Sequence, residues 1–157
     1  MKFKINISLL LFIVGCLFVG FLSSFFSGED IVATYFSLNR PSFAPPHWLF
    51  APVWTVLYIT MGVSVYLVWQ KRDSQKIGNK MIIFFTQLFL NFWWPIIFFR
   101  WNNLSLAAYE ILVLLVLIVV NIFCFKKVSP LAAYLLIPYA IWVFYATILT
   151  FTILSIN

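Results

Sequence analysis

The chain has 157 residues, of which 64% are hydrophobic and only 9% are charged. A soluble globular domain is about half apolar and about a quarter charged, so this composition indicates a protein that lies in lipid. The length favours a single domain, residues 1–157. The net charge of +6 does not indicate nucleic-acid binding, because the basic residues sit between apolar runs and form no basic face.

Five apolar runs are long enough to cross a membrane as helices, which takes about 20 residues. They cover residues 5–27, 48–70, 78–99, 104–125 and 130–154. Because the last three connections are short, we expect consecutive helices to pack as antiparallel neighbours in an all-α bundle. The first run is longer than the core of a signal peptide, about 7–15 residues, so we interpret it as an uncleaved first helix.

The connection over residues 28–47 is the only long one, and its glycine and three prolines break helices. Within it, Ile31 to Leu38 can form a short helix at the membrane interface. Eight lysines and arginines fall on the side of the membrane that holds the N-terminus, against Arg40 and Arg100 on the other side. The positive-inside rule therefore predicts a cytoplasmic N-terminus, with the long first loop and the C-terminus outside.

Aromatic residues make up 21% of the chain and include seven tryptophans. Trp48, Trp69 and Trp101 lie at helix ends, as in interfacial belts. Three further tryptophans, Trp54, Trp94 and Trp142, lie inside the spans. They either belong to a belt or pack against other helices, or they form the wall of a pocket.

Helical spacing groups these tryptophans with other side chains. Trp54, Tyr58 and Met61 share one face of the second span. Gln87, Asn91 and Trp94 share a face of the third span, and Trp142 and Ala146 share a face of the fifth. Amides within a membrane span usually point into the bundle, so Gln87 and Asn91 either join helices by hydrogen bonds or contact a ligand.

Ionisable chemistry is sparse. Glu110 is the only ionisable residue inside a span, and either a structural hydrogen bond or a functional role accounts for it. His47, the sole histidine, follows Pro46 at the end of the long loop, where it is either an exposed or capping residue or a contact to an anionic or metallated ligand. We find no catalytic motif and no metal-ligand cluster, and Cys16 and Cys124 lie in apolar runs without ligand spacing. The sequence therefore predicts no metal site and no required cofactor.

Four blocks of sequence carry a recognisable pattern: NRPSFAPPHWLFAPVW (residues 39–54), LYITMGVS (57–64), QLFLNFWW (87–94) and LLIPYAIWVFYAT (135–147). They resemble the TspO/MBR family, the tryptophan-rich sensory and translocator proteins. Each block alone is a weak match, whereas their order along five spans is specific and covers nearly the whole chain.

The resemblance implies a five-helix bundle in which the long first loop caps a central pocket. It implies a membrane protein that binds porphyrins such as protoporphyrin or haem, and that takes part in tetrapyrrole homeostasis or stress signalling. It also implies a homodimer, and the absence of a transit segment favours a bacterial cytoplasmic membrane. The family's pocket positions fall on Trp54, Asn91, Trp94, Trp142 and Ala146, and its loop positions fall on Tyr35, Arg40, Pro45 and Pro46; Glu110 occupies a position that is often acidic in the family.

Two alternative functions follow from the same resemblance. Some bacterial members degrade protoporphyrin with light and oxygen, and Trp54 and Trp142 would then be the catalytic residues. A small-molecule transporter is the third hypothesis, although a chain without internal repeats gives little support to alternating access. The family's sterol-recognition pattern needs a tyrosine and a basic residue near the end of the fifth span, and residues 149–155 contain neither.

Overall fold

The computed structural model describes residues 6–28 and 30–157, and within these residues the chain forms helices and no strand. The helices are α1 (Ile7–Phe26), α2 (Ile31–Ser37), α3 (Phe50–Trp69), α4 (Gly78–Pro95), α5 (Leu104–Lys126), α6 (Pro130–Leu135) and α7 (Ile137–Ile156). A 3-10 turn, η1 (His47–Leu49), leads into α3, and a π-helical turn, η2 (Ile96–Arg100), continues α4. Lys2 and Lys4, on which part of the topology prediction depends, lie outside the described residues.

Five of the helical stretches are long and apolar enough to cross a membrane, which confirms the predicted number of spans. They are Ile7–Phe26, His47–Trp69, Gly78–Arg100, Leu104–Lys126 and Pro130–Ile156. With a rise of about 1.5 Å per residue, helices of 20 residues or more match a hydrocarbon layer of about 30 Å. The short helix expected within the long connection is also present, as α2.

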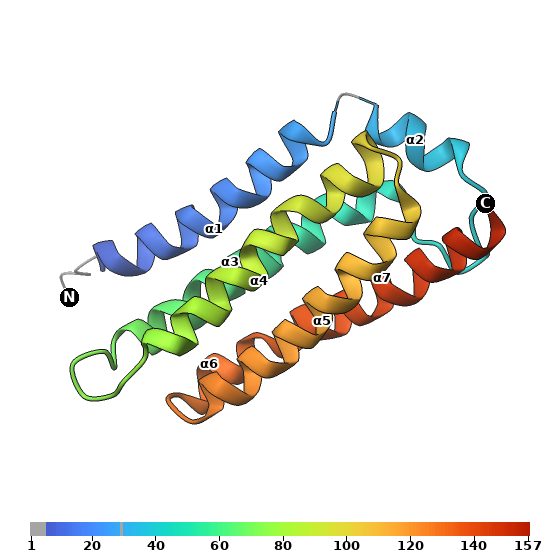
Figure 1. Ribbon diagram of the computed structural model, residues 1–157. Coiled ribbons are helices and arrows are strands. Elements are labelled where there is room, and N and C mark those ends of the chain that lie inside the picture. The colour runs from blue at the N-terminus through green and yellow to red at the C-terminus, as the bar shows by residue number, and fades with distance from the viewer. Residues whose placement is uncertain (1–5, 29) are drawn as a thin grey trace.

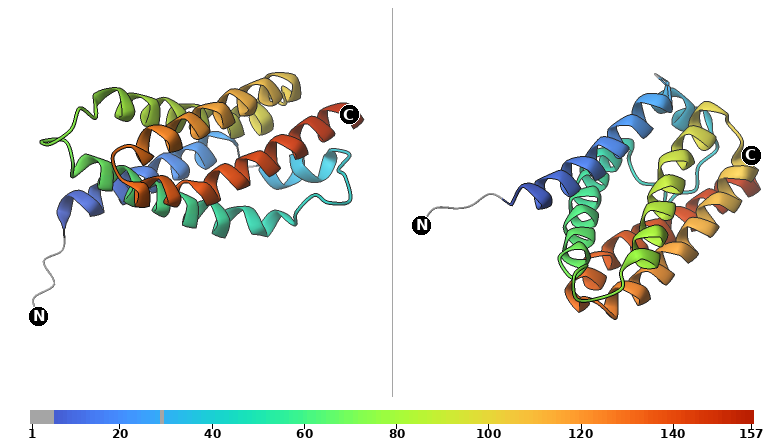
Figure 2. Two further views of the ribbon diagram at one scale, coloured as in Figure 1. Left: turned by 90° about the horizontal axis from the view of Figure 1, so that it is seen from below. Right: turned by 60° about the vertical axis from the view of Figure 1, so that its left-hand side comes forward.

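The five spans run roughly along one axis, with the two ends of the described chain at opposite ends of the bundle (Figure 1). Helix α1 packs mainly on α3 and also on α4, α4 packs on α5, and α5 packs on α6 and α7. Helix α3 packs on α6, which closes the bundle (Figure 2). We call the end with α2 and the C-terminus the α2 end, and the end with the α3–α4 loop and the α5–α6 turn the basic end.

Two spans are interrupted where proline removes a backbone donor. The backbone N–H groups of Trp101 and Asn103 donate to Ile96 and Ile97, 3.0 and 3.1 Å away, beyond the register of an α-helix. Pro95 precedes this π-turn, and Pro138 follows the break at Leu136 between α6 and α7. The fifth span is therefore two helices, whereas the sequence predicted one continuous run.

Helices α1 and α3 approach closely at Gly62. A Cβ atom placed on Gly62 would lie 2.6 Å from the Cα atom of Ile13, so only glycine fits there without moving a backbone. Close approach at small residues is a principal means by which helices associate in lipid. Most of α1 otherwise faces outward, and of its residues only Cys16 and Ser23 are buried.

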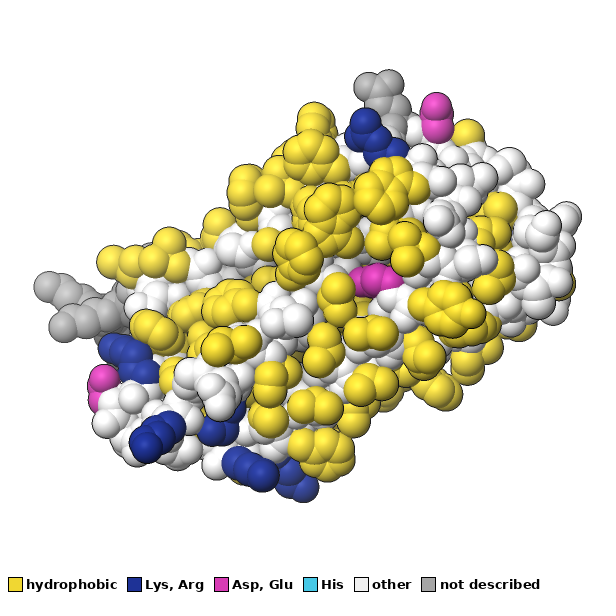
Figure 3. Space-filling model, viewed as in Figure 1, with side chains coloured by type: hydrophobic (Ala, Val, Ile, Leu, Met, Phe, Trp, Pro, Cys, Tyr) yellow, Lys and Arg dark blue, Asp and Glu magenta, His cyan; other side chains and the backbone are white. Residues whose placement is uncertain are grey.

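Apolar side chains cover the middle of the molecule, and Lys and Arg side chains gather at the basic end (Figure 3). Large exposed hydrophobic residues occur on every span, among them Phe21 on α1, Phe89 on α4 and Ile141 on α7. Such a surface is stable only in contact with lipid.

The close approach of α1 and α3 at Gly62 leads to a prediction about the stability of the bundle. Replacing Gly62 with alanine should destabilise the bundle by about 1–3 kcal/mol, because the added methyl group overpacks a backbone contact. The control is Gly15→Ala on α1, where the added atom meets nothing within 4 Å. Thermal unfolding in detergent micelles measures both variants, and equal midpoints would contradict the proposed role of the α1–α3 contact.

Candidate ligand-binding pocket

An aromatic cavity lies toward the α2 end, between α2, α3, α4, η2 and α7. Three tryptophans from three different spans, Trp54, Trp94 and Trp142, contribute to its wall. The remaining lining residues are Tyr35, Phe50, Phe98, Phe99, Ala146, Leu149, Thr150 and Ile153. The polar side chain of Thr150 is engaged within its own helix, because its hydroxyl donates to the Ala146 carbonyl at 2.7 Å.

Ring contacts fix the orientation of the wall. Trp94 stacks on Phe98 with ring centroids 5.1 Å apart, and its indole N–H donates to the Ala107 carbonyl of α5 at 3.2 Å. Trp142 meets Phe50 edge to face at 6.0 Å. Because η2 places both Phe98 and Phe99 on the cavity, the π-turn after Pro95 contributes directly to its shape.

The cavity is small in this conformation, with a volume of about 20 Å³. That is room for about one water molecule, whereas pockets for drug-sized ligands are about 300–1,000 Å³. A flat ligand therefore enters only if wall side chains or the α2 segment (residues 30–49) move.

A chain of buried hydrogen bonds lies beside the cavity and joins α3, α4 and α7. The Tyr58 hydroxyl donates to the Asn91 side-chain oxygen at 2.5 Å, and the Asn91 amide donates to the Tyr139 hydroxyl at 2.9 Å. Tyr139 in turn donates to the Gln87 oxygen at 2.7 Å. Trp54 contacts both tyrosine rings, at 5.6 and 6.2 Å, so the chain supports one wall of the cavity.

The α2 segment is held to α7 and to itself by polar contacts. Tyr145 donates to the Phe43 carbonyl at 2.7 Å, and the backbone N–H of Asn39 donates to the Asn157 side chain at 2.9 Å. Asn157 returns a bond of 2.9 Å to the Asn39 carbonyl. The buried Tyr35 donates to the Pro45 carbonyl at 2.7 Å.

Arg40 lies outside the cavity wall, on the α2 segment. Its guanidinium stacks over the rings of Tyr35 and Phe36, at 4.6 Å from each ring centre. A guanidinium held by its faces keeps its in-plane N–H donors available for carboxylates. His47 is exposed, and its ring centroid lies 5.7 Å from that of Phe36. Pro46 is exposed beside it.

Glu110 on α5 is separate from these groups. Both of its carboxylate oxygens are inaccessible to solvent and have no hydrogen-bond partner among the described residues. It does not line the cavity. The indole nitrogen of Trp142 also lacks a partner within the described chain, although its ring lines the cavity.

The residues selected from the sequence thus occupy four places. The cavity wall holds Tyr35, Trp54, Trp94, Trp142 and Ala146. The hydrogen-bonded chain holds Tyr58 and Asn91, the α2 segment holds Arg40, Pro45, Pro46 and His47, and Glu110 stands apart. The amides of Gln87 and Asn91 join helices, which is one of the two interpretations that the sequence left open.

Sequence reasoning missed Tyr139 and the phenylalanines Phe50, Phe98 and Phe99. Tyr139 follows Pro138 within an apolar run, and its place in the family-like block over residues 135–147 was the available signal. The phenylalanines lie in runs of aromatic residues, where nothing distinguishes a ring that faces a cavity from one that faces lipid.

The chain is similar to known membrane proteins along most of its length. The model of the TspO/MBR family matches residues 12–156. The chain is 38% identical to the tryptophan-rich protein TspO of Chlorobaculum tepidum over 146 residues, which is 90% of each chain. It is 37% identical to the human translocator protein, covering 89% of this chain and 82% of the relative. It is 30% identical to the tryptophan-rich sensory protein of Cereibacter sphaeroides, covering 78% and 76%.

The hydrogen-bonded chain leads to a prediction about stability. Asn91→Leu removes the amide between two tyrosine hydroxyls and should lower the free energy of unfolding by about 1–2 kcal/mol, the upper range for hydrogen bonds between membrane helices. The control is Thr86→Val on the same helix, because the exposed Thr86 hydroxyl bonds only to the Ile82 carbonyl of its own turn. Unfolding by denaturing detergent measures both, and an Asn91 variant as stable as the control would refute a bridging role.

Proposed function

This chain belongs to the TspO/MBR family, and we propose that it is a membrane receptor for porphyrins such as protoporphyrin or haem. The ligand lies against Trp54, Trp94 and Trp142 at the α2 end of the bundle. In this function the chain senses or handles tetrapyrroles and needs no cofactor.

The convergence of three indoles on one apolar cavity carries the proposal. A porphyrin is a flat apolar disc, and aromatic rings supply large contact areas and stack favourably on such discs. Its propionate groups require a cation at one edge. Arg40 supplies this cation from the α2 segment. Its guanidinium stacks on two rings, so its N–H donors, which lie in the guanidinium plane, are available to a propionate.

The size of the cavity makes opening part of the proposed mechanism. A cavity of about 20 Å³ admits a porphyrin only after it opens, and in the proposed mechanism it opens when the α2 segment separates from α7. The contacts that yield in this step are Tyr145 with Phe43 and Asn39 with Asn157. Each is a hydrogen bond near the membrane surface, where water replaces it at a small net cost.

We also propose an orientation and an assembly state. Among the described residues, Lys71, Arg72, Lys76, Lys80, Lys126 and Lys127 lie at the basic end, which supports a cytoplasmic position for that end and for the N-terminus. The α2 segment and the C-terminus then face outward, in a bacterial cytoplasmic membrane. Homodimer formation rests on the family resemblance, and its test is the mass of the complex of protein and detergent by light scattering.

A titration tests porphyrin binding. Detergent-purified protein is mixed with protoporphyrin in the dark, and tryptophan fluorescence and porphyrin absorption are followed. We expect saturable quenching near one ligand per chain, and Trp142→Ala should weaken binding about tenfold or more through the loss of one aromatic wall.

The matched control is Trp48→Ala, because Trp48 is 64% exposed and does not line the cavity. It should bind protoporphyrin as the unchanged protein does. Quenching that never saturates, or that weakens equally in both variants, would reject the pocket as the porphyrin site.

A second candidate function is the light- and oxygen-dependent degradation of protoporphyrin. The observation that favours it is the presence of two oxidisable indoles, Trp54 and Trp142, on the wall of the same cavity. A ligand held there lies in contact with both rings.

Illumination separates the two functions. If the chain is an enzyme, light and oxygen should bleach the porphyrin absorption beyond the rate seen without protein, and Trp54→Phe should slow this bleaching without abolishing binding. Binding that persists while the spectrum stays constant under light would leave the receptor function alone.

A further inference from the structure

The basic end of the bundle carries a concentrated positive charge that the porphyrin proposal does not use. Within the described residues, this end holds five lysines and Arg72, against the single acidic residue Asp73. In the part of the α2 end that the structure describes, the charged residues of the loops and of η2 are Arg40, Arg100 and Asp30. The charge is therefore concentrated at one end of an apolar cylinder (Figure 3).

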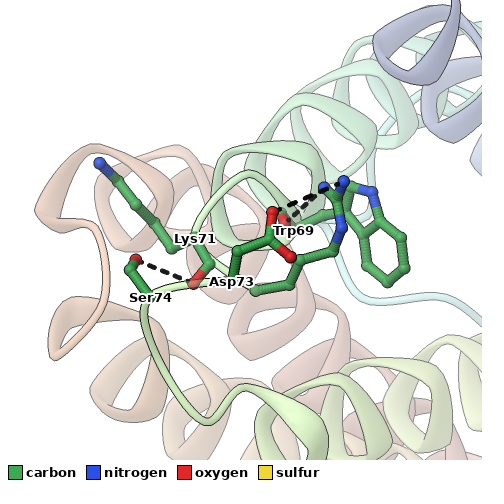
Figure 4. Close-up of polar contacts among 5 residues, drawn as sticks. Trp69, Lys71, Asp73 and Ser74 are labelled. Carbon is green, nitrogen blue, oxygen red and sulfur yellow. Dashed lines mark hydrogen bonds and ion pairs between the residues drawn. The ribbon is translucent and has the colours of Figure 1, made fainter.

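Most of this charge is free of protein partners. The one ion pair among the described residues joins Arg72 to Asp73 at 3.9 Å. Arg72 is also occupied by Trp69, because its guanidinium lies 4.7 Å from that ring and donates to the Trp69 carbonyl at 3.3 Å. In Figure 4 the Lys71 side chain extends away from Asp73, so the carboxylate neutralises Arg72 and not the lysine.

The lysines come from separate elements and surround the same end. Lys71 and Lys76 lie in the α3–α4 loop, whereas Lys126 and Lys127 end α5, and all four are exposed. Lys80 on α4 donates to the Lys76 carbonyl at 2.8 Å, so it lies beside the loop. The loop itself lines an open cleft of about 510 Å³, formed by residues 72–78.

The depth of these charges corresponds to the headgroup layer. Helix α3 ends at Trp69, and α5 ends at Lys126, so the lysines directly follow the apolar spans. Trp69, half-buried beneath Arg72, is a residue type that settles at the membrane interface. Ammonium groups directly beyond the spans lie within reach of lipid phosphates.

We propose that the basic end is a binding surface for anionic phospholipids, whose headgroup phosphates contact Lys71, Lys76, Lys126 and Lys127. Basic clusters next to membrane spans attract anionic lipids, and each positive charge strengthens the binding about fivefold. The open cleft of the α3–α4 loop, which Arg72 and Lys76 line together with Asp73, lies beside these lysines and leaves room for a headgroup. Zwitterionic lipids bind there more weakly, because their choline groups repel the same ammonium groups.

Native mass spectrometry of the detergent-purified protein tests this surface. The probes are phosphatidylglycerol and phosphatidylcholine with identical acyl chains, each titrated to obtain the dissociation constant of the first bound lipid. Phosphatidylglycerol should bind more tightly. Two double variants, Lys71→Gln with Lys76→Gln and Lys126→Gln with Lys127→Gln, should each weaken its binding about twentyfold and leave phosphatidylcholine binding nearly unchanged.

The charge-matched control is Arg40→Gln with Arg100→Gln, which removes two positive charges from the α2 end. It should retain the preference for phosphatidylglycerol. Equal affinity of the unchanged protein for both lipids, or equal losses in all three double variants, would overturn the proposal. If millimolar inorganic phosphate at constant ionic strength displaces phosphatidylglycerol from the unchanged protein, free phosphate is the preferred occupant of the surface, which would overturn the assignment to lipid.

The salt dependence of lipid binding to the unchanged protein provides a second test, which does not depend on whether the variants fold. Raising the salt concentration from about 0.05 to 0.5 M should weaken phosphatidylglycerol binding, since exposed charges are screened over a Debye length of about 10 Å at 0.1 M. Phosphatidylcholine binding should not respond. A preference for phosphatidylglycerol that is insensitive to salt would contradict an electrostatic surface.

Discussion

The hydrogen-bonded chain from Tyr58 through Asn91 and Tyr139 to Gln87 is the constraint on which the rest of the structure depends. In lipid, helices gain no hydrophobic free energy by associating, because lipid tails are as apolar as leucine, so close packing and interhelical hydrogen bonds hold the bundle together. Buried amides and hydroxyls are different, since each one that faces hydrocarbon without a partner is costly. The three hydrogen bonds among these four side chains fix the register of α3, α4 and α7 relative to one another, although the Gln87 side-chain nitrogen has no partner among the described residues.

The same three helices carry the three indoles of the cavity, so the polar chain also determines the geometry of the candidate site. Trp54 packs against the rings of Tyr58 and Tyr139, so the hydrogen bonds that hold these two rings also support its indole. The α2 side of the cavity is held differently, by hydrogen bonds at the membrane surface between the α2 segment and α7. The bundle thus combines a wall fixed by buried polar contacts with a side held by surface hydrogen bonds. The proposed porphyrin binding requires the second side to open.

Much of this arrangement was predictable from residue spacing. The length of the apolar runs predicted five spans, and the i, i+4, i+7 spacing of Gln87, Asn91 and Trp94 predicted a polar face directed into the bundle. The break at Leu136 and the π-turn after Pro95 were not predicted, because the bond pattern around a proline depends on the neighbouring helices. The cavity volume and the isolation of Glu110 were also beyond the sequence, since both depend on side-chain packing between helices.

A structure determined with protoporphyrin bound tests the central claim most directly, namely that the indoles of α3, α4 and α7 form one wall of a ligand site that the α2 segment opens. The account predicts the macrocycle against Trp54, Trp94 and Trp142, with the contacts of Phe43 to Tyr145 and of Asn39 to Asn157 broken or rearranged. A macrocycle on the lipid-facing surface, with the cavity and the α2 segment unchanged, would contradict it.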